Sequence, residues 1–178
     1  NTYKKNFKAH ISFISVDKET GGMDIAFQLR LPGVNFDLSH GGKGKSYGWF
    51  FFTCYNSEQA NTLLEVNASQ NDKDFIMAVN WKKAEEYIKA GKGKMEKARY
   101  AHNTWDDETH TGKSVIKEEV LVLDVENLKD VLYLMPCPKS PHGCDVDPTG
   151  EYIVGSGKLA ALIPVFSFTK MLAAIEKK

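Results

Sequence analysis

The sequence predicts an all-β fold, and the clearest sign is the stretch Met135–Phe168. There Asp147–Gly150 forms a turn, with proline where φ of about −65° is needed and glycine where a positive φ is expected. The β-rich run Glu151–Val154 follows, and Gly155–Gly157 makes the next break. A similar phrase, an apolar strand end followed by Asn, Ser or Asp, recurs at intervals of roughly 40 to 65 residues. Since periods of about 40–50 residues are typical of β-propeller blades, we expect a propeller, with a mixed sandwich as the alternative.

Composition places the chain among ordinary globular proteins. Of its 178 residues, 42% are hydrophobic, and the formal net charge is zero. This balance argues against nucleic-acid binding, which needs a basic face, and no apolar run approaches the ~20 residues that span a bilayer. Three cysteines with no Cys-x-x-Cys pair predict no disulfide framework. The chain opens at Asn1 without a signal peptide, so we expect a piece of a longer protein.

The first predicted strands follow from the alternation of apolar and polar residues and from the turn residues between them. Phe7–Val16 and Met23–Leu31 are predicted strands joined by the hairpin connection Asp17–Gly22. Asn35–Lys45 is polar and rich in glycine, which predicts a loop. Tyr47–Cys54 is a dense aromatic strand, too apolar to face water on both sides.

A short helix is predicted over Gln59–Val66, followed by a polar loop over Asn67–Lys73. Asp74–Val79 is predicted to be a strand. Asn80 is placed to cap the helix expected over Trp81–Ala90, because its short side chain can accept a hydrogen bond from the first turn.

The next segment, Gly91–Lys117, is rich in Gly, Lys and acidic residues and has weak periodicity, so we predict a long excursion that is functional or mobile. Strands are expected at Glu119–Val125, Val131–Met135 and Leu162–Phe168. Thr169–Ile175 should close the chain as a short helix.

His142 is the first candidate for chemistry. Proline before it favours extended backbone and removes a ladder donor, and glycine after it lets the chain turn away. The imidazole is therefore expected at a strand end, where a rigidly held nitrogen suits copper. A single histidine is more often structural, and one histidine cannot make a metal site. Any partners must come from other strand ends.

Tyr55, Glu58 and Asp74 form a second candidate group, because they place oxygen atoms around one strand end. Oxygen ligands suit a hard cation such as Ca²⁺. The residues alone favour the plainer interpretation, a helix-start carboxylate at Glu58 and a strand-end acid at Asp74.

The remaining motifs give weaker evidence for a functional site. The segment His102–His110 contains acids between its histidines, but such charged segments are usually solvated. His40 is interpreted as a loop histidine. The run Gly41–Lys45 lacks the spacing of a phosphate-binding loop. Cys137 and Cys144 flank His142 and could be soft copper ligands, although a cysteine beside a strand is more often a small buried apolar residue.

Several of these motifs together resemble nitrous oxide reductase, in order and approximate spacing, along nearly the whole chain. The matching motifs are Cys54-Tyr55-Asn56-Ser57-Glu58, Asn71-Asp72-Lys73-Asp74-Phe75 with Asn80, Ile88-Lys89-Ala90-Gly91-Lys92, Pro141-His142-Gly143, Asp147-Pro148-Thr149-Gly150 and Gly157-Lys158-Leu159. The Cys-Tyr-Asn-Ser-Glu run and the span from Pro-His-Gly to Gly-Lys-Leu are the specific parts.

The resemblance implies a seven-bladed β-propeller followed by a cupredoxin domain. The whole of residues 1–178 would then be a fragment of the catalytic propeller, about two to three blades with short helices in the insertions, and the cupredoxin domain would lie outside it. A tetranuclear copper-sulfide cluster occupies the propeller centre of the family, and a dinuclear electron-entry copper site occupies the cupredoxin domain. The fragment alone should be inactive.

Carried over by position, the resemblance implies that His142 ligates the copper cluster and so serves as its cofactor-binding and catalytic residue. It implies calcium at Tyr55, Glu58 and Asp74. Ser140 stands where the family often has an asparagine calcium ligand, and its hydroxyl has a shorter reach. A carbonyl ligand would fall near Val66 to Ala68.

The resemblance also implies a reaction, partners and a compartment. The family reduces N₂O to N₂ and water in the periplasm during denitrification, with electrons from a donor such as a cytochrome c or a cupredoxin. It works as a homodimer, and neither a nucleic acid nor a membrane span is implied. The alternatives are a non-enzymatic or calcium-binding β-propeller module and a propeller hydrolase or lactonase with a central Ca²⁺.

Overall fold

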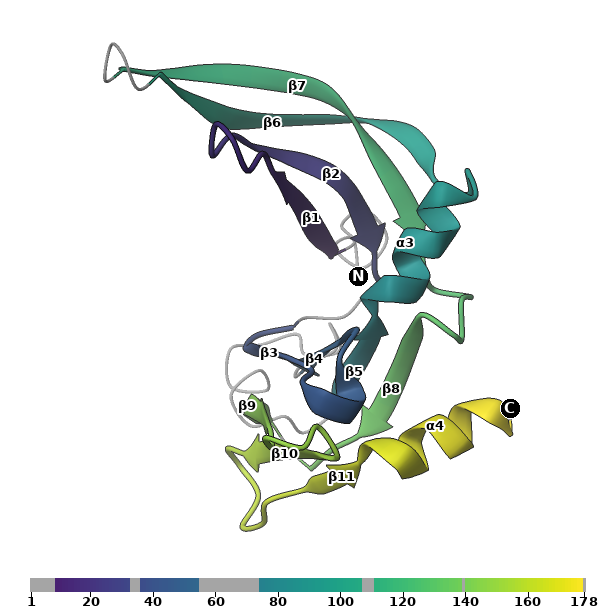
Figure 1. The fold of residues 1–178 in the computed structure, drawn as a ribbon. Helices are drawn as coiled ribbons and strands as arrows, with labels where there is room; N and C mark the ends of the chain where they lie inside the picture. The colour runs from purple at the N-terminus through teal and green to yellow at the C-terminus, as the bar shows by residue number, and fades with distance from the viewer. Residues whose placement is uncertain (1–8, 33–35, 55–73, 107–110, 139, 178) are drawn as a thin grey trace, which may run out of the picture.

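The computed structural model describes residues 9–32, 36–54, 74–106, 111–138 and 140–177. The described residues are mostly β-structure and form three open sheets (Figure 1). Sheet A has the order β1-β2-β7-β6, with strands His10–Val16, Met23–Arg30, Thr111–Asp124 and Lys94–Asp106. Sheet B has the order β3-β4-β5-β8, with strands Ser39–Gly41, Trp49–Cys54, Phe75–Asn80 and Leu132–Pro136. Sheet C has the order β11-β10-β9, with strands Val165–Ser167, Tyr152–Gly157 and Pro141–Val146.

Two α-helices and one 3₁₀ turn complete the described elements. The helix α3 spans Trp81–Lys89 and is capped by Asn80, whose side chain accepts a hydrogen bond from the Lys83 amide. The helix α4 spans Phe168–Glu176, and η1 spans Gly44–Ser46. The predicted Asn80 cap, both helices and the first hairpin are thus confirmed. No described helix is long and apolar enough to cross a membrane.

Sheet B lies at the centre because both of its faces are buried. Alternate side chains of β4 and β5 point to opposite sides. On one side Phe52 and Met77 join a core cluster with β2 and β7 of sheet A. On the other side Phe51 and Ile76 join a cluster with sheet C and α4. The prediction that the aromatic strand does not face water on both sides is confirmed, although the strand begins at Trp49 rather than Tyr47.

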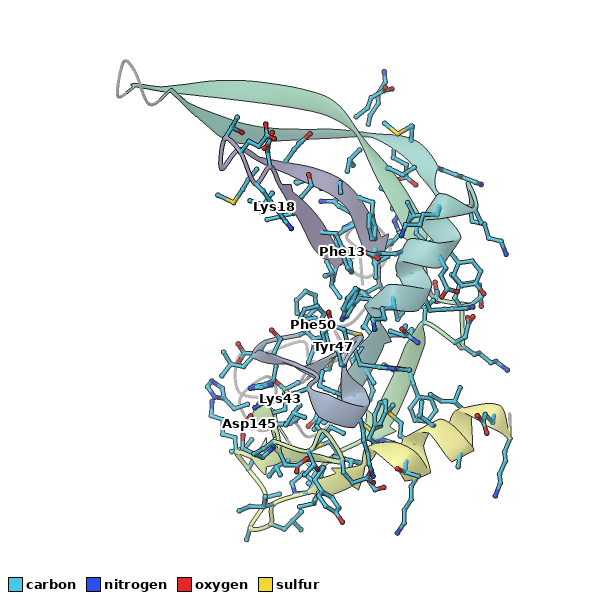
Figure 2. The ribbon with its side chains drawn as sticks, viewed as in Figure 1. Phe13, Lys18, Lys43, Tyr47, Phe50 and Asp145 are labelled. Atoms are coloured by element: carbon cyan, nitrogen blue, oxygen red, sulfur yellow. The ribbon has the colours of Figure 1, made fainter. Side chains whose placement is uncertain are left out.

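Aromatic rings mark the junction of sheets A and B. Phe13 of β1 stacks on Phe27 of β2, with ring centroids 4.3 Å apart. Phe13 and Phe50 both pack against the cluster that the two sheets share, and Figure 2 shows them where the two groups of strands face each other.

The prediction of a long excursion over Gly91–Lys117 is wrong. The segment forms most of the hairpin of β6 and β7, which pair antiparallel from Lys94↔Val122 to Asp106↔Thr111. Figure 1 shows this hairpin reaching past the β1–β2 hairpin. The predicted strand Glu119–Val125 is only the end of β7. The β7 strand also pairs in parallel with β2 over three residue pairs, an arrangement that the sequence did not indicate.

Smaller corrections concern sheets B and C. Gly155–Gly157 does not end a strand, because β10 runs on to Gly157 with a register shift there. Of the predicted strand Leu162–Phe168, only Val165–Ser167 pairs. The predicted loop Asn35–Lys45 contains the short strand β3. The predicted helix Gln59–Val66 and loop Asn67–Lys73 lie outside the described residues.

The all-β prediction therefore holds, while the number of propeller blades stays a prediction. Sheet B is antiparallel throughout and takes its strands in chain order, with α3, β6 and β7 inserted between β5 and β8. Sheet C repeats this pattern with three strands. Antiparallel sheets built this way are the repeating unit of a propeller. None of the three described sheets closes on itself.

Candidate metal centre

His142 is the second residue of β9, the edge strand of sheet C. Pro141 before it is buried and pairs with Gly157 of β10. The side chain of His142 is 57% exposed and lies beside the strands of sheet B. The predicted presentation from a strand end is confirmed, because the proline starts the strand and the imidazole follows it directly.

Two side chains approach His142, that of Asp37 in the segment before β3 and that of Thr53 in β4. The Oδ2 atom of Asp37 lies 3.4 Å from the imidazole Nε2. The buried hydroxyl of Thr53 lies 3.3 Å from the His142 carbonyl oxygen and equally far from the Leu38 carbonyl, so it can donate to either. Among the described residues the Nδ1 atom of His142 has no recorded hydrogen bond, which leaves one ring nitrogen available to a ligand.

Asp74 and Ser140 come together just before His142. The backbone amide of Ser140 donates a short hydrogen bond to Oδ2 of Asp74, and the Cys137 amide donates to the Asp74 carbonyl. Both Asp74 and Ser140 are buried, and Ser140 has a φ of 55°, which is uncommon for a residue other than glycine. Two predicted calcium ligands thus lie at one place. Tyr55, Glu58 and the segment 66–68 lie outside the described residues.

The cysteines are protonated thiols in this setting. Burial is the main cause that raises the pKa of Cys54 to about 12 and those of Cys137 and Cys144 to about 11. The Cys144 thiol lies 3.3 Å from the Phe51 carbonyl oxygen and donates to it. Cys137 and Cys144 are half-buried and pack against the core cluster that contains Phe51 and Ile76, which favours their interpretation as small packed residues.

His40 is part of a strand, not of a loop as predicted. Its Nε2 atom lies 2.9 Å from Oδ1 of Asp145, and its Nδ1 atom lies 2.8 Å from the Gly41 carbonyl oxygen. Both ring nitrogens therefore face acceptors, which leaves neither one for a metal ion.

The glycine-rich loop at residues 42–46 serves packing. The Lys45 amide donates to the Thr149 carbonyl, and the Ser46 amide donates to the Lys43 carbonyl. These amides are not turned towards a bound phosphate. The side chain of His102 and all of His110 lie outside the part that the structure describes, so a metal there stays untested.

A complete metal site is not formed by the described side chains. Among the side chains that the structure describes, within residues 9–32, 36–54, 74–97, 119–138 and 140–177, no three from His, Cys, Asp or Glu gather closely enough to hold a metal ion. The exposed imidazole of His142, with an available nitrogen, could supply one ligand of a copper site, and the Asp74 carboxylate could supply one ligand of a calcium site. The remaining ligands would have to come from other residues.

Fold and site together define a mostly-β protein with an exposed histidine at a strand end. The chain is similar to two curated nitrous-oxide reductases. It is 29% identical to that of Pseudomonas fluorescens over 161 residues, which are 89% of this chain and 21% of the relative. It is 28% identical to that of Stutzerimonas stutzeri over 167 residues, which are 92% of this chain and 22% of the relative. The chain thus spans about a fifth of the length of these relatives. No protein-family profile matches it.

Proposed function

We propose that the gene product containing these residues is a nitrous-oxide reductase, a periplasmic copper oxidoreductase of denitrification. The reaction is N₂O + 2 H⁺ + 2 e⁻ → N₂ + H₂O, with electrons from a small donor such as a cytochrome c or a cupredoxin. One observation carries the proposal: similarity to two nitrous-oxide reductases extends over about nine tenths of the chain. The whole protein would be a homodimer with a cupredoxin domain.

His142 would ligate copper in this protein. The tetranuclear copper-sulfide cluster, when bound, supplies the electron-rich centre that N₂O requires, because N₂O is a weak ligand and inert. The chain contributes orientation. Proline fixes the start of β9, and the Thr53 hydroxyl, buried in sheet B, reaches the His142 carbonyl. The remaining cluster ligands and the dinuclear site would lie in other parts of the protein.

Asp74 would ligate calcium together with Tyr55, Glu58 and Ser140. The position of Asp74 supports this role, because its carboxylate lies against the backbone of the segment that leads into His142. A calcium ion there would fasten that segment and so orient the imidazole indirectly.

Replacing the imidazole tests the copper assignment. We expect His142→Ala in the complete gene product to lower copper content and to reduce N₂O turnover at least about tenfold, since loss of an interaction at a metal centre typically costs 10–100-fold. Copper per protein is measured by mass spectrometry, and turnover by N₂O consumption. His10→Ala on β1 is the control. Full copper loading and turnover in His142→Ala would refute the assignment.

An amide at position 74 tests the calcium assignment separately. Asp74→Asn keeps an oxygen for the Ser140 amide but removes the charge that calcium needs. We expect loss of calcium in metal analysis with the fold retained in circular dichroism. Asp17→Asn, which also accepts backbone amide hydrogen bonds, is the control. Unchanged calcium in Asp74→Asn would contradict the role.

The second candidate is a non-enzymatic, calcium-binding propeller module. The juxtaposition of Asp74 and Ser140 favours it, since it needs no copper. Metal analysis of the complete gene product separates the two: copper supports the reductase, and calcium alone supports the module.

A further inference from the structure

The strand β9 is held on one side by side chains rather than by a β-ladder. Its backbone pairs with β10, and β9 is the last strand of sheet C in the described structure. Its other edge packs against β3 and β4 of sheet B. We call this contact the β3–β9 seam. Its polar members are Asp37, His40, Thr53, His142, Cys144 and Asp145.

Matching spacings on the two sides bring opposite partners together. Asp37 precedes His40 by three residues, and His142 precedes Asp145 by three. Where the segments run alongside each other, Asp37 meets His142 at 3.4 Å and His40 meets Asp145 at 2.9 Å. Three residues of extended chain span about 10 Å, so the two pairs hold β9 at two separate points along the strand (Asp145 is labelled in Figure 2).

The two pairs are not equivalent. Both nitrogens of His40 face acceptors, so both contacts are hydrogen bonds only when the ring carries two protons and a positive charge. A charge-assisted hydrogen bond is stronger than a neutral one. His142, in contrast, reaches Asp37 with Nε2 over a longer distance and keeps Nδ1 available. Metal binding at His142 can therefore replace or weaken the His142–Asp37 contact, but it leaves the His40–Asp145 contact intact.

We propose that His40 and Asp145 are positioning residues for His142. Their side-chain contact at 2.9 Å holds β9 against sheet B, and this keeps the imidazole of His142 in place whether it contacts Asp37 or a metal. The position of β9 follows from the contacts above. Only the final step, that the positioned imidazole binds copper, rests on the proposed function.

Backbone hydrogen exchange tests the positioning without any metal. In the metal-free complete gene product, His40→Gln and Asp145→Asn should each raise amide exchange in β9 about tenfold, because β9 then opens from sheet B more often. The double variant should be no worse than either single one, since both remove the same contact. The reversed pair, His40→Asp with Asp145→His, should restore protection. His10→Gln on β1 and Glu19→Gln in the β1–β2 turn are matched controls away from the seam.

Copper binding tests the consequence for His142. Each single variant should weaken copper affinity about tenfold and change the electron paramagnetic resonance spectrum of the bound copper, and the reversed pair should restore both. A loss of packing alone would lower thermal stability without altering the spectrum of the copper that remains bound.

The two failures are distinguishable. Unchanged β9 exchange in both single variants overturns the positioning role, whatever copper does. Absence of copper from the wild-type protein overturns the proposed function, and the exchange data still decide whether the His40–Asp145 contact holds β9. Should His40→Gln fail to fold, Asp145→Asn decides, because the Asp145 side chain is 74% exposed and tolerates an amide.

Discussion

At the scale of single residues, Gly150 shows how closely two turns interlock. It has a φ of 75°, and a Cβ atom built on it would lie 1.7 Å from the Lys43 carbonyl oxygen. Gly44 on the facing loop has the same restriction, with its Cβ position 2.3 Å from the Thr149 carbonyl oxygen. The glycines of both turns are therefore needed for close backbone contact.

A pair of glycine substitutions separates contact from backbone strain. Gly91 has a φ of 73°, and nothing lies within 4 Å of its Cβ position. Gly91→Ala should cost about 1 kcal/mol of unfolding free energy from the left-handed conformation alone. Gly150→Ala should cost about 1–3 kcal/mol more, because the two turns must also move apart. Urea denaturation measures both, and equal losses would contradict the interlocking.

The sequence predicted the position of His142 at a strand end, but it did not predict which side chains would lie beside it. Proline and glycine on either side are local signals, and local signals fix where a strand starts. Asp37 and His40 meet β9 only because sheets B and C pack together, over a separation of about a hundred residues. The mirrored spacing of Asp37 with His40 and His142 with Asp145 is visible in the sequence. It gains meaning only once the two segments are known to run side by side.

At the scale of elements, Glu151 ties the start of α4 to β10. Its carboxylate accepts hydrogen bonds from the hydroxyls of Ser167, at 2.6 Å, and Thr169, at 2.7 Å, and from the Lys45 ammonium at 3.2 Å. Ser167 in turn caps α4 by accepting from the Lys170 amide. The Ser167 hydroxyl first, then that of Thr169, holds the pKa of Glu151 at about 2.

This lowered pKa predicts a loss of stability in acid. A carboxylate whose folded pKa lies below its unfolded value of 4.5 stabilises the fold above pH 4.5. The contribution should disappear as the pH falls from about 4.5 to about 2. Melting temperatures across this range should therefore drop less for Glu151→Gln than for wild type. Glu19→Gln, on the β1–β2 turn, should retain the wild-type slope, and an identical slope in both variants would disprove the explanation.

The β6–β7 hairpin shows why one element escaped prediction. Its strands are 13 and 14 residues long, whereas strands usually have about 5–6. Its sequence lacks a short apolar run bounded by turn residues, which is the usual strand signal. The two strands are instead stabilised by antiparallel pairing with each other along the hairpin. Such pairing depends on both segments, so neither segment alone predicts it.

At the scale of the molecule, sheet B joins everything else. Its two faces belong to separate core clusters, one shared with sheet A and one with sheet C and α4. The seam that places His142 is an extension of the second contact, because β9 packs on β3 and β4. Perturbing one face of sheet B should therefore disturb the candidate metal centre more than perturbing the other.

Ile76 and Met77 make this test possible from adjacent positions of β5. Both are fully buried, and they point to opposite faces of the sheet. Ile76→Ala and Met77→Ala should each cost about 2–5 kcal/mol of unfolding free energy, the usual range for such cavities. Their similar cost makes each the control for the other.

The location of the damage should differ. Ile76 lies under Gly155 of β10, so Ile76→Ala should raise hydrogen exchange in β9 and β10 and weaken the copper binding proposed for His142. Met77→Ala should raise exchange in β2 and β7 and leave β9 protected, because its cavity opens towards sheet A. If both variants loosened the same strands, the two faces would form one cooperative core, and the orientation of His142 would depend on the whole molecule rather than on the seam with sheet B.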